Sequence, residues 1–294
     1  MEESSLNITS IITDTINSLF SDLFSSIDNS IYSILDDITF IDSNIISDNI
    51  FKNIIGLSSN EGILIVANTL LFGFILYYAI SRLLAYFTGN EIQSCKSFIF
   101  RAIIFGIFMN SSYFICEQLL NLNSLFTLAI RNVGEIVYNK EVSFATFINE
   151  LNSFTAISGN SFNLFSVDGI IKSFISIGLF NLIFSYSLRY VLIKVFTLLC
   201  PFAFLCLINN KTKWIFSSWL RIILSLLLLQ IFISLILLVC FSFTYSSNIL
   251  SKIIYIGCVY TLMKANTIIK EFIGGVSTVT GSPISSLKSL LGGK

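Results

Sequence analysis

The chain has 294 residues, of which 54% are hydrophobic and 12% are charged, and its mean hydropathy is +0.84. Because roughly a quarter of the residues of a soluble domain are charged, this composition excludes an ordinary soluble domain and predicts an all-α polytopic membrane protein. The 17 basic and 17 acidic residues cancel, and there is no histidine to act as a base or metal ligand. The six cysteines form no CxxC pair, so we expect buried small hydrophobic residues.

The first 61 residues form an acidic leader. Ten of the 17 acidic residues precede Gly62, and Lys52 is the only basic residue there. From Ile8 to Ile38 the apolar residues recur at spacings of three and four, which predicts an amphipathic helix. This helix either packs its apolar stripe on the rest of the protein or the membrane surface, or forms a coiled coil with another subunit. The leader lacks the cationic start and apolar core of a signal peptide, so we expect it to persist in the mature protein.

Residues 62–272 are predicted to form the transmembrane domain. A spanning helix needs about 20 apolar residues to cross roughly 30 Å of hydrocarbon. Four segments satisfy this, and a fifth is weaker because Lys252 and Lys264 bracket only a short apolar core. The predicted spans are about 62–87, 98–116, 170–194, 215–243 and 249–269.

The basic residues of the short loops predict the orientation. With the N-terminus outside, the net acidic connection 117–169 is external, and the loop that contains Lys211 and Lys213 is cytoplasmic. Five spans then place the C-terminus in the cytoplasm, where residues 273–294, rich in Gly and Ser, form a flexible tail. The expected location is a bacterial cytoplasmic membrane.

The run 170–208 allows two interpretations. As one straight helix its 39 residues would reach about 58 Å, yet two full spans would need a very tight turn near Arg189 and Lys194. The charge distribution favours one span that ends near Lys194. A re-entrant or interfacial segment then follows, broken at Pro201, because proline lacks the N–H group of a regular helix.

The chain contains no motif for nucleotide hydrolysis, metalloprotease or serine hydrolase chemistry: GxxxxGK[ST], HExxH and GxSxG are all missing. We therefore predict no enzyme activity, no catalytic residue, no cofactor and no metal site. Polar side chains within the spans either bond across helices or line a conduction path. They are Asn68, Asn110, Ser111, Ser112, Asn181, Ser185, Gln230 and Ser234.

Arg189 and Lys194 are the cations that lipid burial explains least well. They are five residues apart, which offsets them by about 140° on a helix, so one can face the headgroups while the other faces the protein interior. No carboxylate lies near their depth in the sequence, which disfavours a proton relay. By contrast, Trp214 and Trp219 fit an interfacial aromatic belt, and Arg221 is close enough to the end of its span to reach the headgroups.

The region around these cations carries a series of features over about 45 residues. They are an arginine-bearing span, a proline break, a short basic loop with threonine and tryptophan, a Trp-Leu pair, and a glutamine in the next span. The residues are Leu188, Arg189, Leu199, Cys200, Pro201, Phe202, Ala203, Phe204, Lys211, Thr212, Lys213, Trp214, Trp219, Leu220 and Gln230. This series resembles the TrbL-like polytopic subunits of conjugation and type IV secretion machines.

This resemblance implies a channel or scaffold subunit that helps to translocate a DNA strand with its bound protein. The implied partners are separate ATPases, other membrane subunits and the transported single-stranded DNA, and the subunit is expected to be an oligomer in the bilayer. Two alternatives remain: a small-solute permease, or a structural membrane component of another bacterial assembly. A permease would be expected to show internal repeats, and none is evident.

Overall fold

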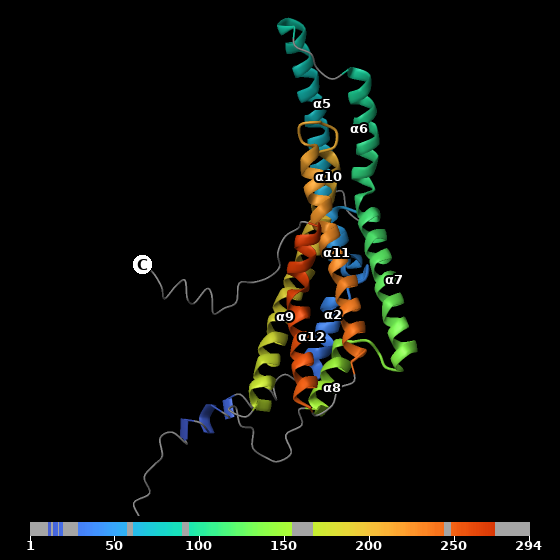
Figure 1. Ribbon diagram of the computed structural model, residues 1–294. Coiled ribbons are helices and arrows are strands. Elements are labelled where there is room, and N and C mark those ends of the chain that lie inside the picture. The colour runs from blue at the N-terminus through green and yellow to red at the C-terminus, as the bar shows by residue number, and fades with distance from the viewer. Residues whose placement is uncertain are drawn as a thin grey trace, which may run out of the picture.

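The computed structural model describes residues 11, 12, 14–16, 18, 19, 29–57, 61–89, 94–154, 167–243 and 248–273, and every regular element within them is helical (Figure 1). The predicted all-α fold is confirmed for these residues. The helices are α2 (Asn29–Thr39), α3 (Asn44–Ser47), α4 (Asn49–Ile55), α5 (Ile63–Thr88), α6 (Cys95–Asn110), α7 (Ser112–Tyr138), α8 (Phe144–Phe154), α9 (Val167–Leu198), α10 (Cys200–Leu205), α11 (Lys213–Phe241) and α12 (Ile249–Ile273).

Within the described residues, three helices are long and apolar enough to cross a membrane: α5, α9 over Gly169–Leu198, and α11. Together, α6 and α7 could provide a fourth crossing, although they meet at an angle of 58°. The predicted fifth segment does form a helix, α12, but this helix is not among those apolar enough to cross a membrane. Lys252, Lys264 and Asn266 lower its hydropathy.

The second predicted span, 98–116, is not a single straight helix. The first part, α6, ends at Asn110, the chain bends at Ser111, and α7 continues to Tyr138, well into the segment expected to form the external connection. The amide of Asn110 donates to the carbonyl of Gly106 one turn back and also pairs with Asn68 on α5. Side-chain bonds of this kind compete with regular backbone bonding, so the polar run Asn110–Ser112 is a natural place for a bend.

The run 170–208 forms one long helix followed by a short one. There is no turn near Arg189 or Lys194, and the irregular break predicted at Pro201 is reduced to the single residue Leu199. Leu199 keeps helical backbone angles, and the bonds from its N–H to Val195 and from Ala203 N–H to its carbonyl continue the helical pattern. Pro201 is tolerated because it lies in the first turn of α10, where its missing N–H costs little. The chain reverses over residues 206–212.

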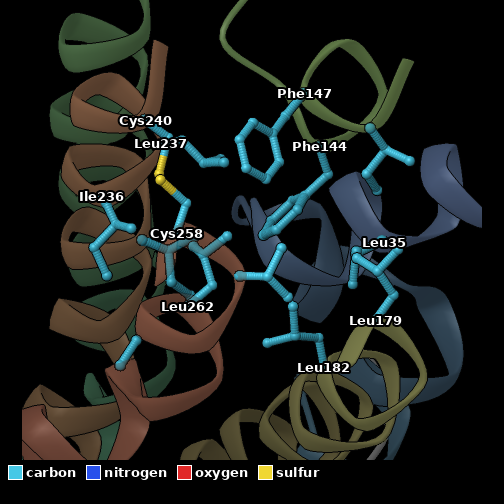
Figure 2. Close-up of a cluster of buried hydrophobic side chains, with 14 of the residues drawn as sticks. Leu35, Phe144, Phe147, Leu179, Leu182, Ile236, Leu237, Cys240, Cys258 and Leu262 are labelled. Carbon is cyan, nitrogen blue, oxygen red and sulfur yellow. The ribbon is translucent and has the colours of Figure 1, made fainter. Parts of the chain in front are cut away.

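The buried hydrophobic residues form two clusters, which lie one above the other along the molecule. The α9–α12 cluster, drawn in Figure 2, includes Leu35, Phe144, Phe147, Leu179, Leu182, Ile236, Leu237, Cys240, Cys258 and Leu262. The α5–α6 cluster includes Ile46, Phe51, Ala67, Phe98, Met109, Cys116, Ile193, Cys200, Phe204 and Ile223. Figure 1 shows α5 and α6 projecting beyond one end of the bundle, whereas α8 and α12 lie towards the other.

The described part of the N-terminal segment contributes to both clusters. Leu35 on α2 is buried in the α9–α12 cluster, whereas Ile41, Ile46 and Phe51 are buried in the α5–α6 cluster. The end of the predicted amphipathic helix forms α2, and Leu35 of α2 is buried against the rest of the protein. This packing is what the first of the two alternatives predicts for this part of the helix. Of the segment Ile8–Phe24, the structure describes only residues 11, 12, 14–16, 18 and 19. The tail 274–294 lies outside the described residues.

Asp36 fixes α2 against the start of α8. Its carboxylate accepts hydrogen bonds from the backbone N–H groups of Phe144, at 2.8 Å, and Ala145, at 3.1 Å. These groups have no partner within their own helix, so Asp36 caps α8 from a distance in the sequence. Burial raises the pKa of the Asp36 carboxyl to about 6, although the two N–H bonds and the charge of Arg131 lower it.

Candidate functional site

The best-defined polar site is built around Arg189, whose side chain is completely buried. It lies near the middle of α9, between Tyr186 of the α9–α12 cluster and Ile193 of the α5–α6 cluster. Three of its nitrogen atoms donate hydrogen bonds: Nε to the carbonyl of Leu226 at 2.8 Å, Nη1 to the carbonyl of Thr39 at 2.8 Å, and Nη2 to Oε1 of Gln230 at 3.0 Å. The guanidinium therefore joins α9, α11 and the last residue of α2.

Gln230 on α11 completes this site. Its Oε1 also accepts from the N–H of Ile41 at 3.2 Å, and its Nε2 donates to the Ile41 carbonyl at 3.0 Å. The chain is not helical at Ile41, so these backbone groups have no helical partner. Gln230 satisfies both of them, and an amide is the side chain suited to this because it carries a donor and an acceptor. The side chain of Ser234 in turn donates to the carbonyl of Gln230.

Arg189 forms no ion pair within the described part of the chain. Its charge is stabilised by two backbone carbonyls and one amide oxygen, and hydrogen bonds to a charged group contribute about 1.5 to 3 kcal/mol each. A buried charge without such partners would cost several kcal/mol. Each of the three guanidinium nitrogen atoms donates to a protein oxygen. We therefore interpret Arg189 as a residue that connects helices rather than one that binds a solute.

Lys194 lies one and a half turns further along α9 and is half-buried. Its Nζ is 5.4 Å from the ring centre of Tyr190 and 5.9 Å from that of Phe51 on α4. Both distances fit cation–π contacts, which contribute about 0.5 to 1 kcal/mol at partly exposed sites. Arg189 is thus completely buried, whereas Lys194 is half-buried beside two aromatic rings.

Pro201 and Trp219 are both buried, and Trp219 belongs to the α5–α6 cluster. The indole N–H of Trp219 donates to the carbonyl of Phe196 at 2.8 Å, and its ring lies 6.0 Å from that of Phe204. This bond ties the start of α11 to the end of α9. Trp219 is thus an inward-facing residue, and the prediction that it belongs to an interfacial belt is wrong.

The remaining predicted site residues are exposed around the turn between α10 and α11. They are Lys211, Lys213, Trp214 and Arg221. Trp214 is 67% exposed, as a belt residue would be. Next to them, Nη1 of Arg101 on α6 donates to the side chain of Asn210. Of the nine predicted residues, the structure therefore brings only Arg189 and Gln230 into direct polar contact, with Lys194 one and a half turns away along α9.

The third member of this site, the segment Thr39–Ile41, was not predicted from the sequence. It contributes backbone carbonyls and an N–H group, which every residue has, so no side-chain motif marks it. The end of the three-and-four spacing at Ile38 is a weak signal, because it predicts only that the helix stops nearby.

Apolar grooves run along the surface of the described helices. A groove of about 560 Å³ runs between α5 and α6, and one of about 420 Å³ runs between α11 and α12; both are lined mainly by apolar side chains. Within the described ranges, no three His, Cys, Asp or Glu residues are grouped so that they could hold a metal ion. The sequence matches no protein-family model, and no curated protein or solved structure is detectably similar to it.

Proposed function

We propose that the protein is a scaffold or channel subunit in a bacterial cytoplasmic membrane, and that the assembly it serves is a conjugative type IV secretion machine. The observation that supports this most strongly is the direct bond between Arg189 and Gln230. These are the arginine and the glutamine of the sequence pattern that resembles TrbL-like subunits. A contact between them gives the pattern a physical purpose, since it joins two neighbouring long helices.

A scaffold role also agrees with the chemistry of the site. The three nitrogen atoms of Arg189 and both ends of the Gln230 amide are bonded to protein atoms. Such groups hold helices in place and are not available to bind a passing solute. For this reason the same site gives no support to the permease alternative.

The basic turn is the proposed contact with the rest of the machine. Lys211 and Lys213 are exposed next to Trp214, and Arg101 bonds to Asn210 in the same turn. Exposed cations attract the phosphate groups of nucleic acid or an acidic protein surface. In this proposal the turn faces the cytoplasm, where the ATPases and the DNA strand would be encountered.

The test is the transfer frequency of a mobile element from donor cells that lack the gene. Wild-type protein should restore transfer, and Lys211→Glu/Lys213→Glu should lower it at least tenfold at an unchanged protein level. The matched control is Lys252→Glu/Lys264→Glu, which makes the same charge change on α12 and should restore transfer. Undiminished transfer from the deletion strain would reject the conjugation role, and full rescue by the Lys211/Lys213 variant would reject the role of the turn.

A further inference from the structure

The bundle is longer than a bilayer is thick. From Val167 to Leu205, α9 and α10 continue with a break of one residue, and these 39 residues rise about 58 Å. The hydrocarbon core of a bilayer is about 30 Å thick. Roughly half of the length of α9 and α10 must therefore lie outside the hydrocarbon, at one end or the other.

The position of α5 indicates which end this is. Only 11% of its most apolar window is buried, so its side chains face the surroundings in nearly every direction. Its apolar run has no charge from Gly62 to Ser81, between Glu61 and Arg82. Those 20 residues rise about 30 Å, which equals the hydrocarbon thickness. A helix exposed in this way needs an apolar environment, and because its uncharged run matches the hydrocarbon thickness, we take α5 as the marker of the depth of the bilayer.

Contacts show which other elements lie at the depth of α5. Asn68 pairs with Asn110, the rings of Tyr78 and Phe98 stack at 3.8 Å, and α10 packs on both α5 and α6. The segments at this depth are also uncharged, over residues 102–116 on α6 and the start of α7, and over 195–210 on the end of α9 and α10. These uncharged segments have 15 and 16 residues, so they are somewhat shorter than the 20-residue segment of α5.

Charged residues bound this layer on both sides. One boundary carries cations alone among the described residues: Arg82, Lys96, Arg101, Lys211 and Lys213. The other carries Glu61, Glu117 and Lys194, with the buried Arg189 just beyond. Arg221 is the one charge of α11 between Lys213 and the end of the helix; it is exposed, and a long arginine side chain can reach the headgroups.

The other half of the bundle is richer in charged residues. Helix α12 packs on α9 and α11 and carries Lys252, Lys264, Lys270 and Glu271. The ion pairs Arg131–Glu141 and Lys140–Glu150 lie around the end of α7 and α8. Exposed apolar side chains also occur in this half and would favour the opposite placement, among them Phe180 on α9, Ile136 on α7, Val239 on α11 and Ile253 on α12. However, each of these helices also buries one face in the bundle, whereas only 11% of the most apolar window of α5 is buried.

We infer that the hydrocarbon core surrounds only the half of the molecule that contains α5, with four crossings: α5, the α6–α7 junction, the end of α9 with α10, and the first half of α11. In this arrangement α12 does not span the membrane and lies outside the cytoplasm, on the same side as α2. The cation boundary faces the cytoplasm, as the positive-inside rule requires. This reverses the expected orientation of the C-terminal end, which depended on a fifth span.

The test is cysteine labelling with a membrane-impermeant maleimide in intact cells that express the protein alone. It is independent of the proposed function because no transfer is measured. The six native cysteines are replaced by serine or alanine, and single cysteines are introduced at Lys270, Asn248 and Lys211. Asn248→Cys is the external control and Lys211→Cys the cytoplasmic control. Lys270→Cys should label in intact cells to at least half the level of Asn248→Cys, whereas Lys211→Cys should label only after permeabilisation.

Labelling of Lys270→Cys only after permeabilisation would overturn the inference, because α12 would then cross the bilayer. A second measurement avoids any folding defect of the cysteine-free protein. Alkaline phosphatase or green fluorescent protein is fused after Lys294 of the otherwise native chain. An active phosphatase and a dark fluorescent protein are expected, and the reverse pattern would overturn four crossings independently of the labels.

Discussion

The α5–α6 half and the α9–α12 half are both helical and apolar, but they are stabilised differently. In the α5–α6 half, α5 remains largely exposed, and its contact with α6 combines the reciprocal amide pair Asn68–Asn110 with an aromatic stack. In the α9–α12 half, ion pairs and the carboxylate of Asp36 join the ends of the helices around the core. Both halves have a buried apolar cluster, so the difference lies in the exposed apolar surface of α5 and in the ion pairs of the other half.

Arg189 and Gln230 lie where the two halves meet. Residues on either side of them along α9 and α11 belong to different hydrophobic clusters. The segment Thr39–Ile41, which both side chains bind, crosses from one cluster to the other at the same point. The account therefore predicts that changes at this junction destabilise the whole protein, whereas changes within one half have smaller effects.

The largest effect is expected for Arg189→Met. This variant leaves the carbonyls of Leu226 and Thr39 without their donors at a buried site, and it should lower stability by about 3 to 5 kcal/mol. The measurement is the thermal unfolding midpoint in mild detergent. Lys194→Met is the matched control, because it removes a half-buried cation from the same helix and should cost less than about 1 kcal/mol. Equal midpoints for the two variants would contradict the junction.

A smaller loss is expected for Gln230→Leu. Leucine has a similar size but bonds neither the N–H nor the carbonyl of Ile41, and it leaves Nη2 of Arg189 without its acceptor, so stability should fall by about 2 to 4 kcal/mol. Ser234→Ala, four residues further on α11, should have little effect, because its hydroxyl only donates within the helix. Amide exchange at Ile41 should also accelerate in Gln230→Leu, and unchanged exchange there would argue against this bond.

The α9–α12 half should respond to pH through Asp36. The pKa of this carboxyl is about 6 in the folded protein and 3.8 when unperturbed, so the folded state binds the proton more tightly. Stability should therefore rise as the pH falls from 7 towards 5, by on the order of 1 kcal/mol. Asp36→Asn should remove this part of the pH dependence. A wild-type protein that loses stability over the same interval, with Asp36→Asn behaving alike, would show that Asp36 does not control it.

The smallest effect is expected within the α5–α6 half. Trp219→Phe removes the bond to the carbonyl of Phe196 and should cost about 0.5 to 1.5 kcal/mol. Trp214→Phe makes the same chemical change at an exposed position and should change the midpoint hardly at all. A loss for Trp214→Phe as large as that for Trp219→Phe would mean that the buried bond is not what distinguishes them.

The sequence predicts the long apolar helices well, because hydrophobic composition over about 20 residues is a strong signal. The bend at Ser111 and the extension of α7 to Tyr138 were not predicted, since the polar run Asn110–Ser112 also suits the inside of a span. Helix α12 was the weakest predicted span because of its lysines. The same lysines lower its hydropathy, and it is not among the helices apolar enough to cross a membrane. Composition alone does not reveal at which depth each helix lies.

The sequence pattern identified Arg189 and Gln230 as candidate site residues, but it did not predict the hydrogen bond between them. They are 41 residues apart, and their contact depends on how α9 and α11 pack. The inward orientation of Trp219 was missed because a tryptophan near a basic loop is also typical of the membrane interface. The partner segment Thr39–Ile41 acts through its backbone, which is the part of a site that residue types describe least.

The most direct test of the two-half account is the depth of α5 and α12 in a reconstituted bilayer. Spin labels at Leu76 and Tyr260 compare positions near the middle of each helix that are exposed to a similar degree, 49% in both cases. Relaxation by oxygen, which concentrates in lipid, and by a water-soluble nickel complex reports the surroundings of each label. We predict that oxygen dominates at Leu76 and the nickel complex at Tyr260. Dominant oxygen relaxation at both positions would place α12 in the hydrocarbon and contradict the account.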